Sequence, residues 1–190
     1  QNGAALVLEL PLPWAVAGAE KFALGGISLL NALGCVDTLT FGSETGDTAP
    51  LMHCAEYLHS DVFNSDIRPE VAKGVSFAAA RTEAVKKALG AETAELLTKP
   101  NCILGIEYCK AILSLNSNIV PQTVQRIAIG HDSDQVHGAF ASASLIRSRS
   151  IEGEEISSYV PENTAVCIRA LQNKKQYPTS LSYLDRAVLA

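Results

Sequence analysis

The sequence has 190 residues, of which 47% are hydrophobic and 18% charged, and its formal net charge is −5. This length allows one domain with a sizeable core and the start of a second, and the composition excludes a disordered chain. The negative charge argues against binding nucleic acid or an acidic membrane through the overall field of the protein. No apolar run has the length of a membrane span, so we expect no membrane association. The five cysteines are odd in number and form no C-x-x-C pair, which indicates a reduced, cytoplasmic protein.

The first elements follow a strand–helix–strand order. Residues Ala4–Pro13 are almost continuously apolar, which is typical of a buried strand in a parallel sheet. A helix is predicted from Ala19, ending at Gly34. A strand is then predicted over Thr38–Phe41, running into a glycine-containing loop. The order indicates an α/β fold. The apolar stripe expected on the helix comprises Phe22, Gly26, Leu29, Leu30 and Leu33.

The middle of the chain is mostly helical in composition, from Ala49 to Leu97. A clearer helix follows Pro100, with Asn101 as a natural cap. A second strand is predicted near residues 119–129, with Gln122, Val124 and Arg126 on one face and Ile127 and Ile129 near its end. After a polar loop, the small and hydroxyl residues of Ala139–Ser150 indicate the start of another helix. The change in character after Pro161 predicts a first domain over 1–161 and the start of a C-terminal helical region over 162–190.

Three places combine a strand end or a helix start with polar groups. Phe41–Glu44 follows a strand with a glycine, which lets a ligand approach the backbone, although a plain turn explains it too. Lys99–Asn101 precedes a helix, and simple capping stays open there. The third place combines helix N–H groups, hydroxyls and guanidinium groups, an arrangement typical of a phosphate site, with capping as the alternative. Its members are Arg126, Ser142, Ser144 and Arg147.

Other kinds of site find little support in the sequence. The loop with His131, Asp132, Asp134 and His137 lacks a further close ligand, so we predict no metal site of protein ligands there. No Ser-His-Asp arrangement, P-loop lysine motif or G-x-G-x-x-G is found. A basic cluster that could touch RNA, or simply be solvated, comprises Arg147, Arg149, Arg169, Lys174 and Lys175.

Several blocks, taken in order, resemble the bacterial tRNA(Met) cytidine acetate ligase family of HIGH-type nucleotidyltransferases. The most specific is P-N-x-I-L-G-x-E-Y at Pro100–Tyr108, followed by the Arg126 strand and the Ser-x-Ser-x-x-Arg helix. The others are GAALVLELPLPWAVAGAEKFALGGISLLNALG, FGSETGD, GVSFAAAR and FASASLIR.

The resemblance implies a Rossmann-like α/β nucleotidyltransferase domain with a parallel sheet and added helices. It implies that ATP, with Mg²⁺, activates acetate as acetyl-adenylate, and that the acetyl group passes to the wobble cytidine of elongator tRNA(Met). The positions matching the family's ATP-contacting residues are Gly42, Asn101, Arg126, Ser142, Ser144 and Arg147. Fixed donors and arginines suit this chemistry because they stabilise the leaving pyrophosphate. A homo-oligomer stays open.

The sequence departs from the family pattern in three ways. Cys102 stands where a second asparagine is usual, which is expected to alter a hydrogen bond near the base, and Phe77-Ala78 replaces a Tyr-Pro pair. The family's N-terminal strands and catalytic H-x-G-H loop have no counterpart here, so we assign no catalytic residue and expect these 190 residues alone to be inactive. Two alternatives remain: a nucleotidyltransferase for another small acid, and a nucleotide- or RNA-binding relic without catalysis.

Overall fold

The computed structural model describes residues 3–126, 141–174, 176 and 177. The chain divides into two compact units, one formed by Leu8–Ile127 and the other by Gln1–Val7 with Ala128–Ala190. The domain boundary expected at Pro161 stays a prediction.

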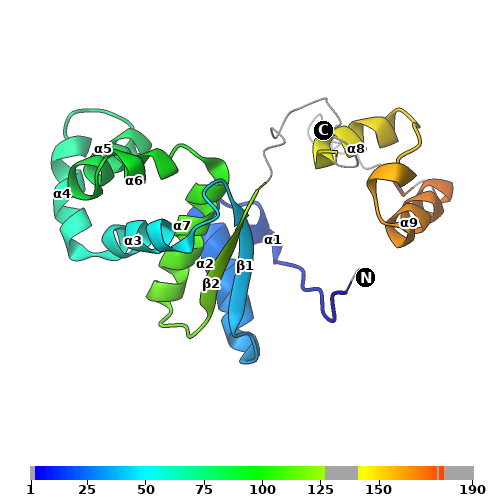
Figure 1. The fold of residues 1–190 in the computed structure, drawn as a ribbon, viewed down its shortest axis with the longest axis horizontal. Helices are drawn as coiled ribbons and strands as arrows, with labels where there is room; N and C mark the ends of the chain where they lie inside the picture. The colour runs from blue at the N-terminus through cyan, green and yellow to red at the C-terminus, as the bar shows by residue number, and fades with distance from the viewer. Residues whose placement is uncertain (1–2, 127–140, 175, 178–190) are drawn as a thin grey trace, which may run out of the picture. The chain divides into compact units, whose positions relative to one another are not determined.

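The first unit is a mixed α/β structure, which confirms the predicted fold class (Figure 1). Its elements are α1 (Leu12–Ala15), α2 (Ala19–Leu33), β1 (Thr38–Ser43), α3 (Thr48–His59), α4 (Asp61–Val71), α5 (Phe77–Leu89), α6 (Ala91–Leu96), α7 (Pro100–Ser114) and β2 (Val120–Gln125). The second unit contains α8 (Ala143–Ile151), the 3₁₀ turn η1 (Ser157–Tyr159) and α9 (Glu162–Asn173). Among the described helices, none is both long and apolar enough to cross a membrane.

The described sheet consists of β1 and β2, which pair in parallel from Thr38 opposite Val120 to Ser43 opposite Gln125. Parallel strands need a long crossover, and α3–α7 supply it. The inner face, with Leu39 and Phe41, packs against the helices, and Figure 1 shows α2 and α7 beside the sheet. The outer face is exposed, since Val124 is 59% accessible. Because the two strands are parallel, both end at the same edge of the sheet, at Ser43 and Gln125.

Helix α7 is the centre of the first unit. Its residues Cys102, Ile106 and Cys109 join a core cluster built from α3 to α6, while Ala111 and Ile112 join a second cluster with Ile27 of α2. Gly105 allows α7 to lie close to the sheet, because a Cβ atom there would be 2.6 Å from Cε2 of Phe41. Neighbouring elements cover α7 on two sides, so its buried residues are not confined to one stripe.

The strand predicted over Ala4–Pro13 is wrong. Its described part forms no strand, and residues 12–15 form the short helix α1. Leu6 and Val7 are 64% and 81% exposed. An apolar run becomes a strand only where a neighbouring strand completes its backbone hydrogen bonds, and β1 and β2 pair only with each other among the described strands.

Helix α2 was predicted correctly in its extent but not in its buried face. Gly34 ends it with a φ of 68°, as expected for a glycine C-cap. The buried residues are Ala23, Gly25 and Ile27, whereas Leu33 of the predicted stripe is 39% exposed. A Cβ atom at Gly25 would lie 2.7 Å from the Trp14 ring, so the indole of α1 packs on this small-residue face. The buried face of α2 is therefore the one whose small residues let the Trp14 indole approach closely, and not the more apolar stripe that was predicted.

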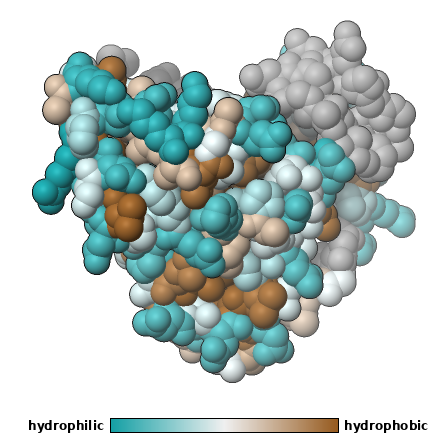
Figure 2. All heavy atoms as spheres, turned by 60° about the vertical axis from the view of Figure 1, so that its left-hand side comes forward, coloured by the Kyte–Doolittle hydropathy of each residue, from teal (hydrophilic) through white to brown (hydrophobic). Residues whose placement is uncertain are grey.

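Apolar side chains also reach the surface of the helical region. Val62 and Phe77 are 60% and 62% exposed. In the view of Figure 2, apolar groups lie as separate patches among hydrophilic side chains. Phe77 is the first residue of α5 and lies outside the core. The replacement of the family's Tyr-Pro pair by Phe77-Ala78 therefore does not disturb the packing of the core.

Candidate functional site

Gly42 and Arg126 lie together at the edge where both strands end. The backbone N–H of Arg126 donates to the carbonyl of Ser43 over 2.9 Å, which extends the strand pairing by one residue. A Cβ atom at Gly42 would be 3.0 Å from Cγ of Arg126, so the arginine stem lies against the glycine backbone. The exposed guanidinium is thus held at the position where α/β sheets commonly bind ligands.

The turn after β1 is fixed by a buried hydroxyl. Ser43 is completely buried, and its Oγ accepts from the N–H of Gly46 over 3.0 Å and from Thr123 Oγ1 over 2.8 Å. Gly46 has a φ of +66°, and a Cβ atom there would be 2.6 Å from Cβ of Gln125. Glycine is therefore required where the turn passes over the end of β2. This turn sets the direction of the next side chain, Glu44.

Glu44 reaches from this turn to the N-terminus of α7. Its Oε1 accepts from the backbone N–H of Asn101 over 3.1 Å and from Asn101 Nδ2 over 2.8 Å. Its Oε2 accepts from the N–H of Cys102 over 2.8 Å. The prediction that Asn101 caps the helix is wrong, because Lys99 is the cap residue and makes no side-chain cap bond. The carboxylate of Glu44, which is distant in sequence, accepts hydrogen bonds from the N–H groups that a local cap residue would otherwise satisfy.

These hydrogen bonds keep Glu44 ionised. Burial raises the pKa of its carboxyl group, but hydrogen bonds from Asn101 and Cys102 outweigh that effect and lower the pKa from 4.5 to about 2. The helix dipole acts in the same direction, since a negative charge is favoured at a helix N-terminus. At neutral pH, Glu44 therefore offers only acceptor oxygens.

Cys102 takes a core position rather than a ligand-facing one. Its side chain is completely buried, and burial, then the neighbouring Glu44, raises the pKa of its thiol. Its backbone N–H donates to Glu44 Oε2, and its thiol also interacts with that carboxylate and helps to lower the pKa of Glu44. The expectation that Cys102 alters a hydrogen bond near a bound base stays a prediction.

A buried ion-pair network lies behind this edge, on α7. Glu107 is 3% exposed, and its oxygens lie 3.2 Å from Arg81 Nη1 and 2.7 Å from Lys110 Nζ. Lys110 also pairs with Glu20 over 2.8 Å. The network joins α2, α5 and α7. Glu107 is the glutamate of the P-N-x-I-L-G-x-E-Y block, and its basic partners give it a structural role.

The remaining predicted residues lie at the start of α8, in the second unit. Ser142 caps this helix, since its Oγ accepts from the N–H of Leu145 over 3.1 Å. The hydroxyl oxygens of Ser142 and Ser144 are 3.1 Å apart, and the side chain of Arg147 is exposed. The capping alternative is thus confirmed for Ser142. The six predicted residues form two groups of three: Gly42, Asn101 and Arg126 in the first unit, and Ser142, Ser144 and Arg147 in the second.

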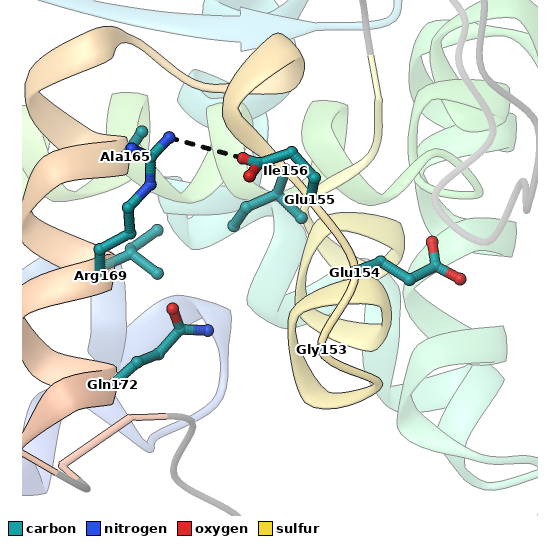
Figure 3. Close-up of a pocket in the computed structure, with 8 residues that line it drawn as sticks. Gly153, Glu154, Glu155, Ile156, Ala165, Arg169 and Gln172 are labelled. Carbon is teal, nitrogen blue, oxygen red and sulfur yellow. Dashed lines mark ion pairs between the residues drawn. The ribbon is translucent and has the colours of Figure 1, made fainter.

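Two members of the predicted basic cluster are paired within the second unit. Arg149 lies over the Tyr159 ring, 5.2 Å from its centroid, and donates to Tyr159 Oη over 3.0 Å. Figure 3 shows Arg169 reaching across a pocket of about 220 Å³ towards Glu155, at 3.6 Å. The pocket lining mixes acidic, basic and apolar residues: Gly153, Glu154, Glu155, Ile156, Ala165, Ile168, Arg169 and Gln172. This charge balance does not favour an RNA-binding patch at the pocket.

No metal-binding group of three histidine, cysteine or acidic side chains occurs within the parts of the chain that the structure describes. The histidine- and aspartate-containing loop from His131 to His137 lies outside these parts, as do Ile127 and Ile129.

A family model described as HIGH Nucleotidyl Transferase matches residues 1–189. The chain belongs to this family. The resemblance inferred from the sequence blocks is thereby confirmed.

Individual relatives carry a more specific name. A protein of Clostridium novyi (strain NT) named tRNA(Met) cytidine acetate ligase is 40% identical over 151 residues, which cover 77% of this chain and 38% of the relative. The chain spans less than half the length of the curated relatives it matches.

Two solved structures of TmcAL from Thermotoga maritima share the fold. The apo form I has a TM-score of 0.85 at 30% identity and covers 96% of this chain and 45% of that one. Form II, bound with alpha-thio ATP, has a TM-score of 0.80 at 32% identity and covers 94% and 43%. The likeness agrees with a Rossmann-like nucleotidyltransferase fold.

The role of Glu44 is what sequence reasoning missed. The tetrapeptide Phe41–Glu44 was singled out, but for its glycine. Glu44 and Asn101 are 57 residues apart, and no periodicity or cap pattern links an acid after one strand to a distant helix. The only signal was the placement of an acid directly after a strand end, two residues after a glycine.

Proposed function

We propose that this chain forms the nucleotide-binding part of a tRNA(Met) cytidine acetate ligase. In this reaction the acetate oxygen attacks the α-phosphorus of ATP, acetyl-adenylate forms and pyrophosphate leaves. The exocyclic amine of the wobble cytidine of elongator tRNA(Met) then attacks the acetyl carbonyl and releases AMP. Acetate, ATP and tRNA are therefore the proposed partners.

The contact between Gly42 and Arg126 carries the proposal. The Arg126 stem lies against the Gly42 backbone and carries an exposed guanidinium at the edge where two parallel strands end. Glycine lets a ligand approach the main chain closely, and arginine binds phosphate oxygens through charge-assisted hydrogen bonds. The likeness to a structure bound with alpha-thio ATP supports a nucleotide as that ligand.

The other predicted residues are proposed to make further contacts with the nucleotide. Asn101 offers an amide held by Glu44 next to the same turn. Ser142, Ser144 and Arg147 are proposed to act on the phosphates from the start of α8. Ser142 already accepts a helix N–H through its oxygen, so its part towards a phosphate is to donate its hydroxyl proton.

Mg²⁺ is proposed to enter with the nucleotide. It keeps much of its water and takes phosphate oxygens, so it needs few protein ligands. This fits a described chain without a three-ligand cluster. The Glu44 oxygens are already used in hydrogen bonds, so we assign no residue of this chain to the metal. When bound, the ion would neutralise charge on the phosphates.

The test is acetate-dependent exchange of labelled pyrophosphate into ATP, measured on the complete gene product. Exchange at saturating acetate, with transfer of labelled acetyl to cytidine of elongator tRNA(Met), is the expected result. Exchange that another small acid stimulates and acetate does not would point to a different nucleotidyltransferase. ATP binding without exchange with any acid would refute an acid-activating role.

A further inference from the structure

The side-chain amide of Asn101 is held in one orientation. The group that faces Glu44 Oε1, at 2.8 Å, must be the amide nitrogen, because an ionised carboxylate only accepts hydrogen bonds. The amide oxygen Oδ1 therefore points to the opposite side of the amide group. Within the described residues, no donor bonds to Oδ1. Asn101 is only partly buried, so this oxygen is accessible to a bound ligand.

The backbone at the start of α7 is already occupied. Oε1 and Oε2 of Glu44 accept from the N–H groups of Asn101 and Cys102. Helix N-termini commonly bind phosphate through such groups, but here the chain supplies its own anion. A phosphate at this point would meet the negative charge of Glu44. Asn101 is therefore arranged for a neutral part of a nucleotide.

We propose that Glu44 is a positioning residue that turns the Asn101 amide so that Oδ1 accepts a hydrogen bond from a donor on the nucleoside part of the bound nucleotide. The proposal rests on the nucleotide role of Asn101 put forward above. In ATP the available donors are the 6-amino group of adenine and the ribose hydroxyls. The arrangement favours nucleotides that carry the donor, because an acceptor or a missing group at that place leaves Oδ1 unpaired.

The test compares the dissociation constants of ATP, inosine triphosphate, 2′-deoxy-ATP and 3′-deoxy-ATP, measured by calorimetry on the complete gene product. Inosine triphosphate replaces the amino donor with an oxygen, and the deoxy nucleotides each lack one hydroxyl. The wild type is expected to prefer ATP over one of them by about tenfold, the size of one lost hydrogen bond in a polar site. The analogue that binds worst identifies the donor.

Glu44→Ala is expected to reduce this preference to about twofold or less, because the Asn101 amide is then free to turn over. Asn101→Ala is expected to remove it, and Glu44→Ala is expected to change it no further in the Asn101→Ala background. Glu95→Ala is the matched control. Glu95 is exposed and pairs with Lys99 over 2.8 Å just before α7, so its loss removes a nearby carboxylate without touching Asn101.

Three results separate the possibilities. A wild type that binds no ATP refutes the proposed function. A wild type that binds ATP and all three analogues equally, or an Asn101→Ala variant that keeps the preference, overturns the positioning role even if Glu44→Ala does not fold. A Glu44→Ala variant that loses affinity for every nucleotide by the same factor also overturns it, since that is what a purely structural cap would do.

Discussion

Replacing Gly42 with alanine is expected to weaken nucleotide binding with little effect on folding. The new Cβ atom would lie 3.0 Å from Cγ and 3.4 Å from Cδ of Arg126. Carbon atoms pack best about 3.5–4.0 Å apart, so the arginine stem must move by a few tenths of an ångström. Arg126 is exposed, and its side chain can move without disturbing the core. We expect the free energy of unfolding to change by less than about 1 kcal/mol.

The expected loss of affinity for ATP follows from the displacement of the Arg126 guanidinium. A hydrogen bond to a charged group contributes about 1.5–3 kcal/mol, so losing one phosphate contact weakens ATP binding by about 10- to 100-fold. Calorimetric titration with ATP measures the affinity, and urea unfolding of the same samples measures stability. Arg126→Ala is the comparison variant, because it removes the guanidinium without adding a Cβ atom.

Three results would contradict this reasoning. The first is a Gly42→Ala variant that binds ATP as tightly as the wild type. The second is a loss of affinity that persists in full when Gly42→Ala is added to Arg126→Ala, since the methyl group would then act on something other than the arginine. Weaker binding that tracks a large loss of stability would equally contradict a local effect.

Three further predictions concern stability and are checked by urea unfolding. Gly105→Ala should destabilise the protein by about 1–2 kcal/mol, because the steric cost against the Phe41 ring of β1 exceeds the gain in helix propensity. Gly26→Ala, which has open space around it, should stabilise the protein by about 0.5–1 kcal/mol. Equal effects of the two substitutions would contradict the close packing at α7. The pKa of Glu44 in the folded state lies below its usual 4.5, so the stabilisation by its carboxylate is present above pH 4.5 and is lost as pH falls towards 2. The difference in the free energy of unfolding between wild type and Glu44→Ala should therefore shrink over that range. A constant difference would contradict an ionised Glu44 at the start of α7. Arg81→Met should cost about 1–3 kcal/mol by depriving buried Glu107 of one partner, and adding Glu107→Leu should recover part of it; a further loss in the double variant would show that the ion pair is worth more than apolar packing.

Much of the local structure follows from short sequence signals. The stop of α2 at Gly34 and the serine cap of α8 at Ser142 both depend on residues within one turn. The stop was expected, and the cap was one of the two alternatives left open. The strand at Thr38 was also expected, and β1 continues to Ser43. These features depend on backbone conformation and nearby donors, which the local sequence specifies.

Features that depend on a distant partner were missed or wrong. The apolar run from Ala4 has strand composition, but a strand needs a partner to complete its hydrogen bonds. The buried face of α2 is the one that lets Trp14 approach Gly25, which an apolar stripe does not reveal. Burial is decided by which surfaces fit together, and apolar character alone does not predict that fit.

By itself the sequence determined the α/β class, the end of α2 at Gly34 and the motifs that match the HIGH nucleotidyl transferase family. Only the tertiary structure decided that Arg126 lies against Gly42 and that Glu44, not a local cap, holds the start of α7 and the amide of Asn101. The physical reason is the range of the interactions. Caps and turns form between neighbours in the chain, whereas these contacts join residues 57 to 84 positions apart and exist only after the crossover helices have packed.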